Sequence, residues 1–305
     1  RPSGSGPATR DDAGVPDVRP AVYQDAQGRR RRACHAGSRS AEEASRASET
    51  RSQDHDARDP TFVTTTPPAP RVMAASIAHN EGAKIGRVLD RFPPGLVDRV
   101  AVVDDASTDE TAGIAEAKGA VVLKHAARRG AGAAIRTAIR YAETERYDVL
   151  VILAGNDKDR PPEIERLLAP IIHDGYDFVQ GSRYLKGGDF GNMPFYRQMA
   201  TRYVHPLLFS LVVGRRFTDT TNGFRAIRLS ALRDARIDLD QAWLDKYELE
   251  PYLFYSLVKH GYRVTEVPVT KIYPLHELGY TKMKPISGWW SILRPLILLG
   301  LGLKR

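Results

Sequence analysis

The chain is poor in cysteine, since Cys34 is the only one among its 305 residues. A disulfide within the chain is therefore excluded, and so is a zinc site built from several cysteines.

The chain also lacks a long apolar run. No segment reaches the ~18–20 apolar residues that a membrane-spanning helix needs. The nearest is the stretch 288–305, which contains Trp289 and Trp290, is interrupted by Arg294 and Pro295, and has a basic end. This composition is typical of a segment at a membrane interface. A C-terminal helix packed on the core would explain it equally well.

The first seventy residues lack lysine and have almost no large apolar side chain before Phe62, although they hold eleven arginines. Such a composition cannot bury a core, so we predict a disordered tail and linker over residues 1–70. The segment has no apolar run of the kind found in secretory signals. Its basic cluster at 29–32 reads as solvated, and we expect no nucleic-acid partner.

The net charge of the chain is +8, and residues 71–305 hold 34 basic and 27 acidic side chains. Most of the positive surplus therefore lies in the part that can fold. A basic surplus favours anionic partners such as phosphates or an acidic membrane surface, and a merely soluble basic surface is the alternative.

Apolar segments alternate with amphipathic ones from residue 71 onward. We predict strands at 71–77, 99–105, 120–125 and 147–153, and helices at 80–92, 107–119, 130–143 and 161–172. Continuous β-branched strands that alternate with helices indicate an α/β fold with a mostly parallel sheet covered on both faces. Ligands of such sheets bind at the carboxyl ends of the strands.

Charged and polar side chains follow each predicted strand. In chain order they are His79, Asn80 and Glu81; Asp104 and Asp105; Arg128, Arg129, Gly130 and Gly132; and Asn156, Asp157 and Asp159. Acids and bases that meet at one sheet edge suit a nucleotide with Mg²⁺ or Mn²⁺ between carboxylates and phosphates. Taken alone, the two aspartates could equally cap the following helix. Taken alone, the glycines favour close packing over binding of an anion.

Several motifs, in this order, resemble the family-2 glycosyltransferases of GT-A fold, and among them the dolichol-phosphate mannose synthases and polyprenyl-phosphate glycosyltransferases. The motifs are SIAHNE (76–81), VVDDASTDET (102–111), HAARRGAGAAIRTAI (125–139), NDKDRPPEI (156–164), GSRY (181–184) and DTTNGFRAIR (219–228). Two further stretches, 247–269 and 279–293, continue the resemblance, which covers residues 71–305.

The resemblance implies a GT-A domain over 71–305, with a nucleotide-sugar half at 71–180 and an acceptor half at 181–305 that ends in a membrane-surface segment. It implies an inverting, metal-dependent transfer from a GDP- or UDP-sugar to a polyprenyl phosphate. The enzyme would be cytoplasmic and peripheral to the cytoplasmic membrane face. A soluble hydroxyl acceptor remains an alternative, as does a degenerate nucleotide-sugar-binding protein without catalysis.

Residue by residue, the resemblance implies a nucleotide-sugar site formed by Asn80, Glu81, Asp104, Asp105, Arg129, Gly130, Gly132 and Asn156. It implies Asp157 and Asp159 as ligands of Mg²⁺ or Mn²⁺. Gly155 departs from the family pattern, because the first aspartate of the usual Asp-x-Asp motif aligns with it.

For the acceptor phosphate the resemblance implies Arg183, Arg202, Asn222, Arg225 and Lys282. It thus implies a catalytic set of Asp157, Asp159, Arg225, Lys282 and Glu250. A cluster of Arg and Lys also suits a phosphate nucleophile on chemical grounds. Glu248 or Glu250 could act as a general base for a hydroxyl acceptor, or both could be carboxylates on a helix surface. The sugar, the base and the oligomeric state stay open.

Overall fold

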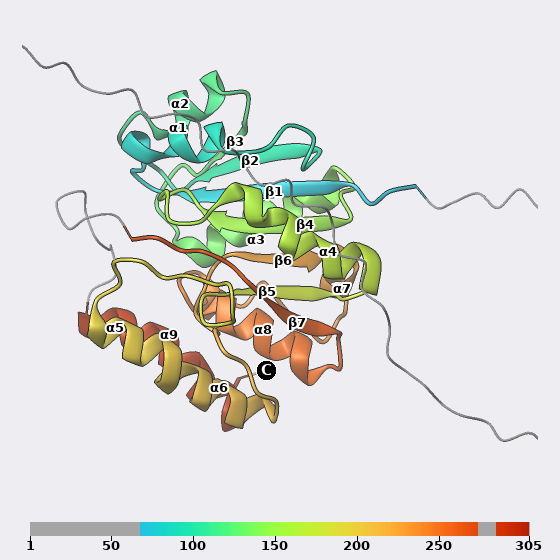
Figure 1. The fold of residues 1–305 in the computed structure, drawn as a ribbon, viewed down its shortest axis with the longest axis vertical. Coiled ribbons are helices and arrows are strands. Elements are labelled where there is room, and N and C mark those ends of the chain that lie inside the picture. Colours follow the sequence, from blue (N-terminus) through green and yellow to red (C-terminus); the bar gives the residue numbers. More distant parts are fainter. Residues whose placement is uncertain (1–67, 274–284, 305) are drawn as a thin grey trace, which may run out of the picture. The chain divides into compact units, whose positions relative to one another are not determined.

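The computed structural model describes residues 68–273 and 285–304, and for 285–289 it describes the backbone alone. The predicted tail up to residue 67 and the segment with Lys282 lie outside the described residues. The described part is an α/β fold around a seven-stranded sheet with strand order β3-β2-β1-β4-β6-β5-β7 (Figure 1). The predicted class, a mostly parallel sheet flanked by helices, is confirmed.

The first half of the fold follows the predicted alternation. Its elements are β1 (Val72–Ala78), α1 (Gly82–Asp90), β2 (Arg99–Asp104), α2 (Thr111–Ala117), β3 (Val121–Lys124), α3 (Ala131–Thr144) and β4 (Val149–Ala154). The four strands are parallel. The helix predicted over 107–119 is shorter than expected, because Asp104 accepts the N–H of Ser107 at 3.0 Å and holds residues 104–107 in a turn. Since the strands are parallel, their carboxyl ends meet at one edge.

The second half completes the sheet with one reversed strand. Its elements are η1 (Pro161–Glu163), α4 (Ile164–Asp174), β5 (Phe178–Ser182), α5 (Phe195–Met199), η2 (Ala200–Val204), α6 (His205–Val213), β6 (Arg225–Arg228), α7 (Leu229–Leu232), η3 (Ala242–Leu244), α8 (Leu249–Lys259), β7 (Val264–Pro268) and α9 (Pro285–Gly300). Strand β6 runs antiparallel to β4 and β5, with Arg225 opposite Ile152. The start of β6 therefore lies beside the end of β4.

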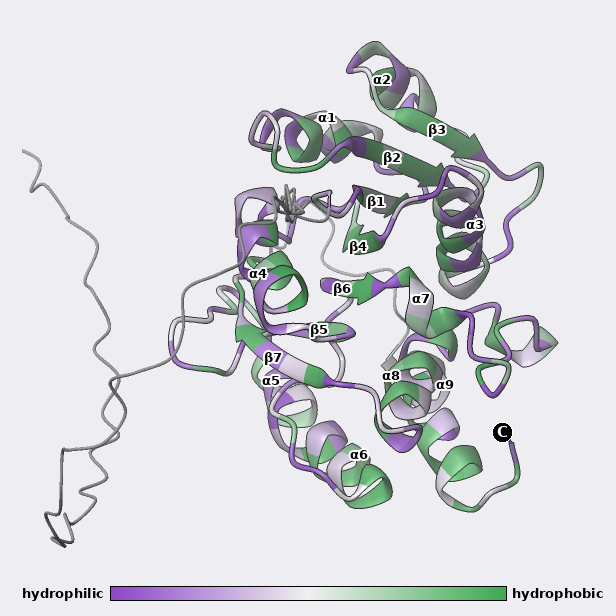
Figure 2. Ribbon diagram, turned by 90° about the vertical axis from the view of Figure 1, so that its right-hand side faces the viewer, coloured by the Kyte–Doolittle hydropathy of each residue, from purple (hydrophilic) through white to green (hydrophobic). Residues whose placement is uncertain are grey.

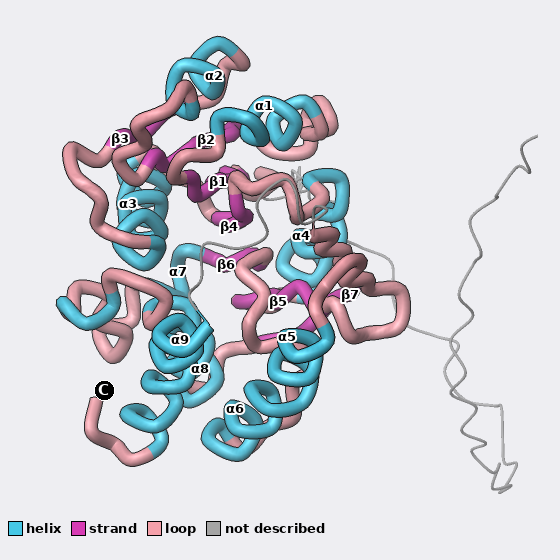
Figure 3. The backbone as a smooth tube through the Cα atoms, turned by 90° about the vertical axis from the view of Figure 1, so that its left-hand side faces the viewer, coloured by secondary structure: helices cyan, strands magenta, loops and turns pink. Residues whose placement is uncertain are grey.

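Helices cover both faces of the sheet, with α3 and α8 on one side and α4 on the other (Figure 3). Alternate residues of β1 point to opposite faces, as the pleat of a strand requires. Met73 packs in the core formed with α3 and α8, whereas Ala74 packs in the core formed with α4.

Helices α6 and α9 pack against each other and against α8, outside the sheet layers. Both helices carry hydrophobic stretches (Figure 2). We call the segment from α5 to α6 together with α9 and the residues that follow it the outer layer. Large apolar side chains are exposed on it at Phe195, Tyr196, Met199, Tyr203, Val204, Leu207, Leu208, Leu211, Trp290, Ile297, Leu301 and Leu303. Within the described residues, no helix combines the length and the hydropathy needed to cross a membrane.

Candidate active site

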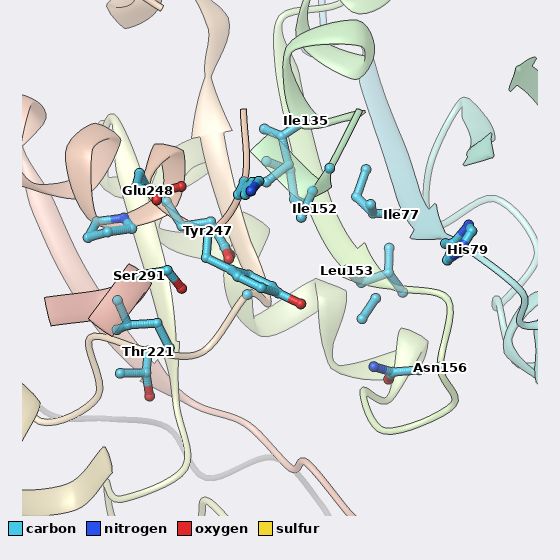
Figure 4. A pocket seen from close by; sticks show the side chains of 18 of the residues that line it. Ile77, His79, Ile135, Ile152, Leu153, Asn156, Thr221, Tyr247, Glu248 and Ser291 are labelled. Atoms are coloured by element: carbon cyan, nitrogen blue, oxygen red, sulfur yellow. The ribbon is translucent and has the colours of Figure 1, made fainter. Parts of the chain in front are cut away.

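A cavity of about 940 Å³ lies where the two halves of the sheet meet at the carboxyl ends of β1 and β4. Nine of its lining side chains are Lys or Arg and four are Asp or Glu, so its wall is positively charged and suits phosphate groups. Figure 4 shows that both halves of the chain contribute to it, with Ile77, His79, Leu153 and Asn156 from the first and Thr221, Tyr247, Glu248 and Ser291 from the second.

Asp105, just after β2, anchors the entrance of α3 at the cavity wall. Its carboxylate accepts the backbone N–H groups of Arg129 and Gly130, each at 2.8 Å, and lies 2.8 Å from Nδ1 of His125. Burial raises the pKa of Asp105, but these hydrogen bonds and the nearby His125 outweigh burial and hold the pKa below its ordinary value. The carboxylate is therefore charged and fixes the loop in front of α3.

The glycines at the start of α3 serve close packing. Gly130 has a φ of +109°, and a Cβ there would lie 2.6 Å from the carbonyl oxygen of Asp245. A Cβ on Gly132 would overlap the carbonyl oxygen of Leu244. The N–H groups of Gly132 and of the next residue already donate to the carbonyls of Lys246 and Asp245, at 2.7 and 3.0 Å. These two backbone N–H groups at the start of α3, which could otherwise bind an anion, are thus already hydrogen-bonded to backbone carbonyls.

The loop after β4 sends alternate residues to different surroundings. Asn156 and Lys158 line the cavity, whereas Asp157 and Asp159 do not. Asp157 has a φ of +62°, in the left-handed region that aspartate tolerates better than most residues.

Both aspartates are engaged by protein cations. The carboxylate of Asp157 accepts a hydrogen bond from the Nε of Arg87 on α1 at 2.8 Å, and it also pairs with Arg91, the residue that follows α1. Asp159 is 1% exposed and lies 2.5 Å from the Nζ of Lys271. Neither carboxylate lines the cavity, and each is paired with a different protein cation, so the expected metal site stays a prediction.

Two further observations concern the expected metal site. A Cβ on Gly155 would lie 3.0 Å from the Cβ of Ala78 and 3.2 Å from the carbonyl oxygen of Ile77, so the position that aligns with the missing aspartate has little room for a side chain. In the part of the chain that the structure describes, no group of three or more His, Cys, Asp or Glu is arranged to hold a metal ion.

Lys158 is the basic side chain that the loop after β4 presents to the cavity. It is 7% exposed, and its Nζ lies 4.7 Å from the centre of the Tyr273 ring. Burial, together with the positive charges of Lys271 and Arg197, lowers the pKa of Lys158 to about 7, against the opposing charge of Asp159.

Arg225 connects the two halves of the cavity at the start of β6. It donates to Glu250 at 3.0 Å and to the carbonyl oxygen of Asn222 at 2.6 Å. Among the described residues, four buried polar atoms of the cavity-lining side chains lack a hydrogen-bond partner: Nε of Arg225, Oε2 of Glu248, Oδ1 of Asn156 and Nε2 of His205. Because buried polar atoms are normally paired, these atoms mark positions for ligand groups.

Two arginines expected at the acceptor phosphate lie elsewhere. Arg183 is 2% exposed and forms a two-point pair with Asp219, at 2.6 and 2.8 Å, which keeps it out of the cavity wall. Arg202 is exposed on η2, with its guanidinium 5.6 Å from the Tyr184 ring. The expected Lys282 lies outside the described residues.

Three residues expected to bind substrate have local structural contacts instead of a place on the cavity wall. Asn80 accepts the N–H of Thr108 at 2.8 Å, and Asp104 accepts that of Ser107 at 3.0 Å, so both shape the turn after β2. Asn222 is fully buried, and its side chain donates to the carbonyl oxygen of Gly181 at 3.0 Å.

The structure brings seven of the expected residues to the cavity: Glu81, Asp105, Arg129, Gly130, Asn156, Arg225 and Glu250. Their individual roles stay predictions. Sequence reasoning missed Lys84, Lys158, Arg197, Lys271 and Tyr273, which also line it. No local sequence pattern singled out Lys158, because its direction depends on the left-handed backbone at Asp157.

The family model for glycosyl transferase family 2 matches residues 75–236. The chain belongs to glycosyltransferase family 2. It is therefore a glycosyltransferase, as the motifs predicted.

Relatives and solved structures agree with this family. The undecaprenyl-phosphate mannosyltransferase of Micrococcus luteus is 33% identical over 219 residues, which are 70% of this chain and 87% of that protein. The dolichyl-phosphate hexose transferase of Haloferax volcanii is 31% identical over 223 residues, 72% of this chain and 89% of that protein.

Among solved structures, glucosyl-3-phosphoglycerate synthase of Mycobacterium tuberculosis, in complex with Mn²⁺, UDP and glucosyl-3-phosphoglycerate, matches with a TM-score of 0.53. It shares 21% identity, and the match covers 77% of this chain and 81% of that one. The same enzyme has also been solved with Mg²⁺ and UDP. At this identity the likeness shows the fold, and the GT-A architecture expected from the motifs is confirmed.

Proposed function

We propose that this glycosyltransferase moves a hexose from a nucleoside-diphosphate sugar to a polyprenyl phosphate, with inversion at the anomeric carbon. The relatives from Micrococcus luteus and Haloferax volcanii are named for transfer to lipid phosphates, and the structural neighbour was crystallised with UDP. Both substrates carry phosphate groups, which a cavity wall dominated by Lys and Arg suits.

One observation carries the choice of acceptor: the cavity is continuous with the outer layer. Trp290, Ser291, Ile292 and Arg294 of α9 line the cavity, and Trp290 is 58% exposed. A phosphate-binding cavity beside a band of exposed apolar side chains fits an acceptor with a charged head and a long apolar tail.

The same layer supports a peripheral position at the cytoplasmic face of a membrane. Its exposed leucines and aromatic side chains, among them Leu207, Leu211 and Trp290, match the composition of helices that lie in the interface plane. The polyprenyl tail would then remain in the lipid while its phosphate reaches the cavity.

In the proposed reaction, a phosphate oxygen of the acceptor attacks C1 of the sugar from the face opposite the leaving group. The bond between C1 and the diphosphate oxygen breaks, and its electron pair leaves with the nucleoside diphosphate. A phosphate oxygen is already ionised near pH 7, so the step needs little help from a general base. Arg225 and Arg294 lie where they can orient the acceptor phosphate, and the cations near β4 can stabilise the charge on the leaving group.

Mg²⁺ or Mn²⁺, which the resemblance implies, would supply charge neutralisation at the diphosphate. Asp157 and Asp159 face protein cations rather than the cavity, so no step is assigned to a metal ion here.

A second candidate is transfer to a soluble hydroxyl. The favouring observation is Glu248, which lines the cavity, is 4% exposed and has an Oε2 without a hydrogen-bond partner in the described residues. Such a carboxylate could accept the proton of a hydroxyl acceptor.

The test is release of nucleoside diphosphate from UDP- and GDP-sugars, with a short-chain polyprenyl phosphate or with soluble alcohols such as 3-phosphoglycerate. We expect stimulation by the polyprenyl phosphate alone, and Glu248→Gln should then lower kcat by less than tenfold, because no proton must be removed. Stimulation by a soluble alcohol alone, with a loss of about 10²–10⁴ in Glu248→Gln, would replace the lipid acceptor with a hydroxyl.

A further inference from the structure

We infer that Lys158 and its basic neighbours, rather than a divalent metal ion, neutralise the diphosphate of the donor in this enzyme. The inference rests on the nucleotide-sugar donor proposed above and concerns the loop after β4. In that loop the chain presents Asn156 and Lys158 to the cavity and keeps Asp157 and Asp159 away from it.

The first argument is the direction of the carboxylates. Asp157 occupies a left-handed backbone conformation and is paired with Arg87 on α1 and with Arg91 just after it. To ligate a metal in the cavity, its side chain would have to leave both arginines, and the backbone turn would have to rearrange.

Asp159 is held by more buried contacts than Asp157. It is 1% exposed, its Oδ1 lies 2.5 Å from the Nζ of Lys271, and its Oδ2 accepts the N–H of Ala154 at 3.1 Å. A single isolated β-bridge joins Asp159 to Lys271 through the backbone as well. Moving the carboxylate to a metal would leave the ammonium group of Lys271 in the cavity wall without its charged partner.

A third carboxylate is not available at the remaining motif position. A side chain on Gly155 would meet Ala78, the backbone of Ile77 and the side chain of Ile85 within 3.0–3.2 Å. The backbone there is packed against β1 and α1, so the position is not a vacant ligand site that one substitution would restore.

The second argument is the charge of the cavity near this loop. Lys84, Lys158, Arg197 and Lys271 all line the cavity. Lys84 is paired with Glu81 at 3.1 Å and Lys271 with Asp159 at 2.5 Å, so two carboxylates face four cations and the positive charge prevails. This surplus would repel a divalent cation. A nucleoside diphosphate would instead be attracted, and Lys or Arg clamps can stabilise transferring phosphoryl groups in the same electrostatic role as Mg²⁺.

In the transfer step, the bond from C1 to the diphosphate oxygen breaks while the bond from the acceptor phosphate oxygen to C1 forms. No proton has to move. The negative charge of the bound diphosphate favours the ammonium form of Lys158, which donates a hydrogen bond to the departing diphosphate, and Lys84 and Arg197 add positive charge beside it. Lys158 is thus assigned as a catalytic residue that contacts the leaving group.

The first experiment needs no variant. Binding of UDP and GDP to the full chain is measured by calorimetry in EDTA and again with MnCl₂, and release of nucleoside diphosphate is followed under both conditions. We expect one of the nucleotides to bind with a Kd that changes less than about twofold on adding Mn²⁺, and turnover to persist in EDTA. Binding that tightens tenfold or more with Mn²⁺, or turnover that requires Mn²⁺, would overturn the inference.

Variants then test whether Lys158 supplies the positive charge that neutralises the diphosphate. Lys158→Met should weaken nucleotide binding about tenfold or more and lower kcat about 10²–10³-fold, the usual cost of removing one transition-state donor. Lys158→Arg should recover part of both losses. The matched control is Lys186→Met, which removes an exposed lysine outside the cavity. Asp157→Asn keeps a residue that tolerates a positive φ, and it should lower nucleotide affinity and kcat much less than Lys158→Met does. A larger loss in Asp157→Asn than in Lys158→Met would refute the inference and favour a metal ion held by Asp157.

The outcomes separate this inference from the proposed function. Nucleotide binding without Mn²⁺, but no transfer to polyprenyl phosphate, would remove the acceptor proposal and leave the inference standing. Transfer to polyprenyl phosphate that occurs only with Mn²⁺ would refute the inference and leave the acceptor proposal standing. If neither nucleotide binds under either condition, both are refuted.

Discussion

Replacing Gly132 with alanine is expected to lower the free energy of unfolding by about 2–6 kcal/mol. The added methyl group would overlap the carbonyl oxygen of Leu244 and lie 2.7 Å from that of Lys246. Overpacking of this kind costs roughly 1–3 kcal/mol. The segment 244–246 must move away from α3, which also weakens two backbone hydrogen bonds of 2.7 and 3.0 Å, each worth about 0.5–1.5 kcal/mol.

The assay is urea unfolding of the full chain, with Gly113→Ala as the matched control. Gly113 is an exposed glycine in α2 whose added Cβ would meet only Glu110, at 3.4 Å. The control should therefore gain about 0.5–1 kcal/mol from helix propensity. Nucleotide affinity is measured beside stability. If Gly132→Ala unfolds like the parent chain and loses nucleotide binding, the glycine serves a ligand and our packing argument is wrong.

Three further predictions concern buried charge, pH and the outer layer. Arg183→Met should lower the free energy of unfolding by about 3–5 kcal/mol, because it leaves the carboxylate of Asp219 buried without its ion-pair partner. Asp219→Asn in the same chain should recover part of that loss in urea unfolding. Burial lowers the pKa of His205 to about 4 from 6.5. As the pH falls from 6.5 towards 4, the unfolded chain therefore binds a proton at His205 while the folded chain does not. Stability should rise with pH across that window, and His205→Gln should remove up to about 3 kcal/mol of the dependence, measured by thermal unfolding from pH 4 to 7. Replacing Leu207 and Leu211, 61% and 70% exposed, with Glu should weaken sedimentation with anionic vesicles tenfold or more while thermal stability stays unchanged, and unaltered sedimentation would contradict the proposed membrane surface.

The parallel half of the sheet could be predicted because its strands are continuous apolar runs. The segment 147–153 has that pattern, and the structure places β4 there. Strand β6 was not assigned, because its four residues include arginines at both ends and its apolar character is weak. Its position depends on pairing with β4, a contact between distant parts of the chain that local patterns do not contain.

The site was predicted less well for a similar reason. The motifs identified the loop after β4, but not which of its side chains enter the cavity. That choice depends on the left-handed backbone at Asp157, and on Lys271 meeting Asp159 from more than a hundred residues away. Arg183 and Arg225 look alike in the sequence. Only the three-dimensional structure shows that the first pairs with Asp219 and the second faces the cavity.

The late position of β6 in the chain has a consequence for synthesis. Strand β4 is apolar along its whole length, and one of its edges pairs only with β6, whose last residue is Arg228. One edge of strand β5 also pairs with β6 and stays unpaired until β6 has been made. The other edge of β5 pairs with β7, which follows later still. Until the ribosome has released residue 228, the nascent chain therefore presents one unpaired edge of β4 and both edges of β5, which are templates for association with other chains. We expect C-terminal truncations before this residue to aggregate, and holdase chaperones to engage the nascent chain over this interval.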